Sequence, residues 1–123
     1  MMTAVIFNCE GIFNLTSVQK HQLTQKLNAS NIKIMPHEIS NLLAISKVDA
    51  IAILSALQAN DLSKNYIVLY HNCEPDYAVE YIPFENGFPS MPWTCENCQN
   101  DVFDIGEISF GLIAITKTSI QFI

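Results

Sequence analysis

The sequence contains no arginine, and its basic residues other than histidine are six lysines. Arginine is the side chain that most often reads guanine and binds phosphate through paired hydrogen bonds, so its absence weighs against DNA recognition. Charged residues make up 15 % of the 123 residues, against roughly 25 % in an average domain, and half of the chain is hydrophobic. This composition excludes an intrinsically disordered chain and supplies enough apolar surface for a core.

The sequence also lacks a basic leader with a long apolar run, and no stretch approaches the roughly 20 apolar residues that span a bilayer. We therefore expect a cytoplasmic protein without membrane contact. Since that compartment keeps thiols reduced, the four cysteines favour free thiols or a metal site over disulfides. Common enzyme motifs such as a GxSxG elbow, a P-loop, an HExxH sequence or a dinucleotide fingerprint are missing as well. We expect no enzymatic activity and no catalytic residue.

The hydrophobic pattern predicts one α+β domain over residues 1–123, with a helical part at about 16–62 and a β-rich part at about 65–123. Apolar residues at helical spacing, after residues that favour helix starts, predict three helices that begin near Thr16, Pro36 and Ser46. In the third helix, an apolar stripe that includes Ile51 and Leu54 is expected to face the core.

From Tyr66 the hydrophobic period changes from helical to alternating, which predicts β-strands. Segments 66–71 and 77–82 are separated by turn-forming residues, so we expect a β-hairpin. A long strand is predicted at 107–116, and the apolar C-terminal residues 120–123 are expected to pair in a sheet.

Charge is distributed unevenly along the chain. Residues 1–64 hold five lysines and four acids, a net charge of +1, whereas residues 65–123 hold one lysine and eight acids, a net charge of −7. The helical half is thus nearly neutral, and the β-rich half is acidic.

Two short helices joined by a tight turn at 45–47, followed by a β-hairpin, resemble the winged helix-turn-helix family. Residues 37–62 carry the resemblance, which implies that the helix after Ser46 is the recognition helix and that 66–82 form the wing. The resemblance implies an α+β fold in which winged-helix-like helices are followed by an antiparallel β extension. It also implies a regulatory role in bacterial stress or defence.

Some small bacterial winged-helix domains carry a zinc-ribbon-like extension with a cysteine pair on each knuckle. In this chain the second knuckle stands as Cys95-Glu-Asn-Cys98, whereas the first is degraded and has Cys73 with Asp76 in place of its second cysteine. The chain therefore resembles a degenerate zinc ribbon in this region.

The candidate metal ligands are His71, Cys73, Cys95 and Cys98. Three sulfurs and one nitrogen are an accepted structural zinc set, and a CxxC knuckle bends two thiolates toward one centre. Asp76 is an alternative fourth ligand through oxygen. The competing interpretation is a ribbon that has lost its metal, with the thiols acting as small apolar groups. The sequence leaves open one structural zinc or no cofactor.

Charge favours a protein partner over DNA. The expected solvent face of the recognition helix has Lys47 as its one cation, and an acidic wing repels the phosphate backbone. The acidic β-rich half, together with aromatic residues in the irregular stretch 83–93, suits a basic protein partner. The alternative is that these aromatic residues only seal the core under a long loop. The residues expected to contact it are Glu74, Asp76, Glu80, Phe84, Phe88 and Trp93.

The sequence thus favours a small non-enzymatic adaptor or regulatory protein that binds another protein through an acidic β-rich surface. One alternative is a winged-helix transcriptional regulator that binds DNA. Another is a small module stabilised by a zinc ribbon. The sequence is also compatible with a homodimer.

Overall fold

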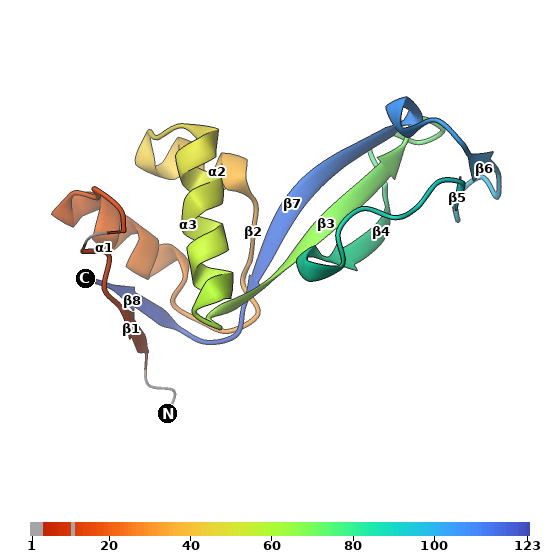
Figure 1. Ribbon diagram of the computed structural model, residues 1–123. Helices are drawn as coiled ribbons and strands as arrows, with labels where there is room; N and C mark the ends of the chain where they lie inside the picture. Colours follow the sequence, from red (N-terminus) through yellow and green to blue (C-terminus); the bar gives the residue numbers. More distant parts are fainter. Residues whose placement is uncertain (1–3, 11) are drawn as a thin grey trace. The chain divides into compact units, whose positions relative to one another are not determined.

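The computed structural model describes residues 4–10 and 12–123 (Figure 1). Within these residues the chain forms three α-helices, eight β-strands and two short 3-10 helices. The predicted α+β class is confirmed. The chain divides into two compact units, of which unit 2 is Tyr66–Ile113 and unit 1 is the remainder. Residues 114–123, which the sequence groups with the β-rich part, therefore belong to the helical unit.

The helices of unit 1 begin where the sequence predicts. Helix α1 (Ser17–Lys26) starts with a capping box, in which the Thr16 hydroxyl accepts from the Gln19 amide at 3.1 Å and the Gln19 side chain accepts from the Thr16 amide at 2.9 Å. Helix α3 (Lys47–Ala59) is capped by the Ser46 hydroxyl, which accepts from the backbone of Asp49.

Helix α2 (Pro36–Leu43) has proline in its first turn and ends at Ala44, whose φ of 55° is left-handed. The axes of α2 and α3 bend by 116° across the connecting turn. Among the described residues, no single helix is long and apolar enough to cross a membrane. Helices α2 and α3 taken together reach the length and apolar composition of a membrane span, but they are bent by 116° at the turn between them.

The core of unit 1 lies among the three helices. The residues that α3 buries there are Ala50, Ile53, Leu54 and Leu57. Ile51, expected in the same stripe, is 42 % exposed instead. Each residue turns a helix by about 100°, so Ile51 lies off the face that the four buried residues occupy.

Short strands complete unit 1. Strand β1 (Val5–Phe7) pairs in parallel with β8 (Ile120–Phe122), so the apolar C-terminus lies in a sheet. Strand β2 (Lys33–Ile34) pairs antiparallel with the end of β7 (Ile108–Thr116). The larger sheet has the order β2-β7-β3-β4.

The predicted hairpin is formed by β3 (Ser63–His71) and β4 (Ala78–Pro83), which pair antiparallel with an irregularity between Leu69 and Tyr70. Strand β3 begins before the expected Tyr66. Its polar start can be buried because the Asn65 amide group donates to the Leu54 carbonyl at 3.0 Å.

Unit 2 contains a second, smaller hairpin, formed by β5 (Trp93–Thr94) and β6 (Asp101–Val102). The sequence predicts the knuckle between these strands but not the strands themselves. The 3-10 helices Phe84–Asn86 and Ile105–Glu107 lie in the connections before and after this hairpin. A core of Ile67, Leu69, Trp93, Cys95 and Val102 joins the small hairpin to β3.

Candidate metal centre

Two turns supply the four candidate ligands, all of them within unit 2. His71 is the last residue of β3, and Cys73 follows in the turn toward β4. The backbone of Glu74 donates to the His71 carbonyl at 3.2 Å, and the backbone of Tyr77 donates to the Glu74 carbonyl at 3.2 Å. These bonds curl the turn so that Cys73 stays beside the end of β3.

The second turn is the knuckle between β5 and β6. The Cys95 amide donates to the Asn100 carbonyl at 3.0 Å, and the Gln99 amide donates to the Cys95 carbonyl at 2.8 Å. Gln99 adopts a left-handed φ of 64°, which closes the loop around Cys98. The CxxC spacing therefore produces the tight bend that the sequence predicts.

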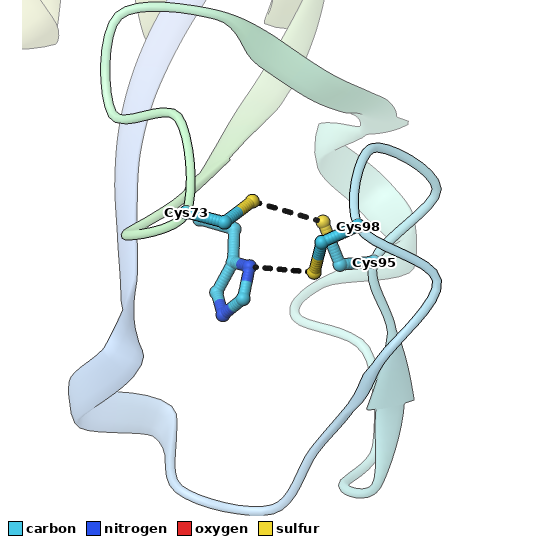
Figure 2. Close-up of side chains that lie close together, drawn as sticks. Cys73, Cys95 and Cys98 are labelled. Atoms are coloured by element: carbon cyan, nitrogen blue, oxygen red, sulfur yellow. Dashed lines mark hydrogen bonds between the residues drawn. The ribbon is translucent and has the colours of Figure 1, made fainter.

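The four ligand atoms converge. The Sγ atoms of Cys73 and Cys95 are 3.7 Å apart, and the Sγ of Cys98 is 3.5 Å from the Nδ1 of His71 (Figure 2). All four atoms lie within 4.8 Å of one another. Figure 2 shows the Cys73 side chain facing Cys95 and Cys98 from the opposite turn. The structure thus brings together all four predicted ligands, and the group could bind a metal ion.

The ligands differ in their access to solvent. Cys95 is fully buried and His71 is 6 % exposed, whereas Cys98 is half-buried and Cys73 is exposed. Asp76, the alternative ligand, is exposed and lies outside the group of four. The fourth cysteine, Cys9, is buried in unit 1, and burial raises the pKa of its thiol.

Trp93 supports the centre from inside unit 2. Its ring meets the His71 imidazole edge-on, with 6.2 Å between the ring centroids. Its indole N–H donates to the Glu80 carboxylate at 2.8 Å, which links β5 to β4. Trp93 is only 7 % exposed, so it lies in the core and not on the contact surface expected from the sequence.

The thiols influence one another's ionisation. Loss of water around its sulfur, followed by the hydrogen bonds and charge of Cys95 and Cys98, raises the pKa of Cys73 to about 11. The hydrogen bond from the Asn100 backbone lowers the pKa of Cys98. Without a cation, the Cys73 thiol therefore resists ionisation. A divalent ion among the three thiols reverses that preference, because its charge stabilises each thiolate.

Comparison with protein-family models, curated proteins and solved structures finds no match for this chain. The chemistry of the site is therefore inferred from its own residues.

Unit 2 is strongly acidic on its surface. Residues 66–113 hold eight of the twelve acids and no lysine or arginine. All eight are exposed, among them Glu74, Asp76 and Glu80. Phe84 and Phe88 are 45 % and 49 % exposed, so they differ from Trp93 and lie where a partner can reach them.

Unit 2 also has an apolar cavity with a volume of about 250 Å³, which the sequence pattern does not predict. Of its lining residues, Phe88 belongs to the contact residues expected from the sequence, whereas Ile105 and Phe110 do not. A signal was present, because Ile108 and Phe110 are two residues apart on a strand and so share one face. Assigning that face to a cavity also requires the position of Phe88, which the sequence does not give.

Proposed function

We propose that His71, Cys73, Cys95 and Cys98 hold one structural zinc ion. The convergence of the four ligand atoms carries the proposal. With Zn–S of about 2.3 Å and Zn–N of about 2.0–2.1 Å, a tetrahedral ion places two sulfurs about 3.8 Å apart and a sulfur and nitrogen about 3.6 Å apart. Two of the corresponding distances are 3.7 Å and 3.5 Å, and all four atoms lie within 4.8 Å of one another, so the group is close to the size that a tetrahedral ion requires.

The ligand set favours a structural role over a catalytic one. Catalytic zinc sites keep one position open for water or substrate, whereas four protein ligands fill a tetrahedral ion. The ligands belong to two turns separated by β4 and the irregular stretch after it. An ion would tie these turns together and so stabilise a unit whose second hairpin has only two residues in each strand.

The acidic surface of unit 2 supports an adaptor function. Eight exposed acids without lysine or arginine favour a basic protein partner and repel nucleic acid. Three thiolates around a divalent ion would add one further negative charge. In this proposal the zinc fixes the shape of the surface, the acids attract the partner, and no reaction is catalysed.

Metal content and thermal stability test the zinc site. Protein purified without added metal should hold about one zinc per chain, and a chelator should lower its melting temperature, since metal binding is coupled to folding. Cys95→Ser and His71→Ala should each reduce the zinc content. Asp76→Asn is the matched control and should keep it.

Metal-free protein whose melting temperature is the same with and without chelator would overturn the proposal. Zinc that is lost in Asp76→Asn but retained in His71→Ala would replace the ligand set with one that contains a carboxylate.

A winged-helix regulator that binds DNA is the second candidate. One observation favours it: the 116° bend between α2 and α3 falls within the roughly 90–120° of helix-turn-helix motifs. The exposed face of α3 opposes it. Val48 is 75 % and Ile51 42 % exposed, and Lys47 is the one cation of that helix. An apolar face of this kind suits protein contact better than the DNA backbone.

A further inference from the structure

The cavity in unit 2 is apolar throughout. Its residues come from β3, from the stretch before β5, from the 3-10 helix 105–107 and from the start of β7. The lining residues are Leu69, Phe88, Pro89, Met91, Ile105, Ile108 and Phe110. Its volume of about 250 Å³ exceeds the roughly 150 Å³ of an engineered apolar cavity that binds benzene. The space is therefore large enough for one bulky aliphatic or aromatic side chain.

Two phenylalanines at the cavity expose much of their surface. Phe88 and Phe110 meet edge-to-face with 4.8 Å between ring centroids, yet they are 49 % and 65 % exposed. Ile105 is 59 % exposed. Single exposed apolar residues are common, but three around one apolar cavity mark a surface suited to contact with another molecule.

Two acidic residues adjoin the lining residues along the chain. Asp104 and Glu107, both exposed, are direct chain neighbours of the lining residues Ile105 and Ile108. The 3-10 helix 105–107 holds them in place, because the Gly106 amide donates to the Asp104 carboxylate at 2.9 Å and the Glu107 amide to the Asp104 carbonyl at 3.0 Å. No lysine or arginine in unit 2 neutralises these charges.

We infer that this cavity binds a segment of a partner protein that carries one bulky apolar side chain flanked by lysine or arginine. The apolar side chain fills the space beside Phe88 and Phe110, and the flanking cations pair with Asp104 and Glu107. The inference rests on the proposed adaptor function and names its contact site and the chemistry of its partner. It also places the partner contact near β7, instead of at the acidic residues around Glu74 that the sequence predicts.

Charge separates this occupant from others. A fatty acid would bring its carboxylate toward the like charges of Asp104 and Glu107, and a neutral apolar molecule would gain nothing from those charges. A second copy of this chain would offer the exposed Val48 beside Lys47. The negative charge of Asp49 in the same turn would, however, repel Asp104 and Glu107. A basic segment from another protein meets both the apolar and the acidic features.

The test is a titration of the full, zinc-loaded chain with a short peptide that has one leucine between two pairs of lysines. Binding is followed by the methyl resonances of Ile105 and Ile108, which should shift as the peptide is added. A peptide with serine in place of the leucine should weaken binding by about tenfold or more, as expected for loss of a buried anchor residue.

Variants locate the site. Phe110→Ser and Glu107→Lys should each weaken binding by about tenfold, since one removes an apolar wall and the other a flanking charge. Phe110 is 65 % exposed, so its replacement leaves the core intact, and an unchanged melting temperature verifies this. Val48→Ser is the control, an apolar position of unit 1 that is 75 % exposed, and it should leave peptide binding and the shifts of Ile105 and Ile108 unchanged.

Equal binding of the leucine and serine peptides, or no shift at Ile105 and Ile108, would overturn the cavity as the contact site. If the peptide then perturbs only residues around Glu74, the adaptor function stands and the cavity fails. Concentration-dependent self-association that Phe110→Ser abolishes, without peptide binding, would overturn the inference in favour of a second copy as occupant.

Discussion

At the scale of single residues, position within a turn of helix or a knuckle decides what each side chain does. Ile51 and Leu54 have similar chemistry and lie three residues apart, yet one is 42 % exposed and the other is fully buried. Cys9 and Cys73 differ in the same way. The buried Cys9 contributes to the core of unit 1, whereas the exposed Cys73 completes the group of four candidate metal ligands. Residue type alone does not separate these roles.

Substitution of two α3 residues tests the helix register directly. Leu54→Ala should lower the free energy of unfolding by about 2–5 kcal/mol, because it opens a cavity in the core of unit 1. Ile51→Ala, the matched control, should cost much less, since Ile51 already contacts solvent. Denaturant unfolding measures both values. Equal losses in the two variants would mean that the register of α3 is wrong.

At the scale of helices and strands, local chemistry predicts most of unit 1. Capping residues, the proline of α2 and helical spacing place all three helices within a few residues. The alternating segments likewise predict β3, β4 and β7. The parallel pairing of β1 with β8 could not be predicted, because those strands lie at opposite ends of the chain and their contact depends on the fold between them.

The small hairpin shows why the site was predicted better than its setting. The CxxC spacing identifies Cys95 and Cys98, but β5 and β6 have two residues each, too few to show an alternating pattern. That hairpin positions Trp93 between the centre and Glu80, a buried role that its sequence context does not distinguish from a surface aromatic. Ligand types are thus readable from the sequence, whereas the residues that support them need the fold.

At the scale of the whole molecule, charge and apolar surface are divided between the two units. All six lysines lie in unit 1 with four acids, a net charge of +2, while unit 2 carries eight acids and no lysine or arginine. The candidate metal centre and the apolar cavity both belong to unit 2. In the proposed function, the metal stabilises unit 2 and its acidic, partly apolar surface holds a basic partner. The helical unit has an apolar face of its own on α3.

This division predicts how ionic strength affects association. An acidic unit attracts a basic partner through a field that is screened over about 8 Å at 0.15 M salt, so added salt should slow association more than it speeds dissociation. The lysine-flanked leucine peptide and stopped-flow mixing measure both rates. Glu74→Lys and Asp76→Lys should slow association in the same way. Glu80 is left unchanged because its carboxylate holds the Trp93 indole, and reversal there would disturb the core.

Duplex DNA should show no retardation with this protein in a gel-shift titration at physiological salt. Tight, sequence-specific retardation there would contradict the adaptor function, because the phosphate contacts would have to come from the lysines of unit 1 and the face of α3 would be a DNA-reading surface.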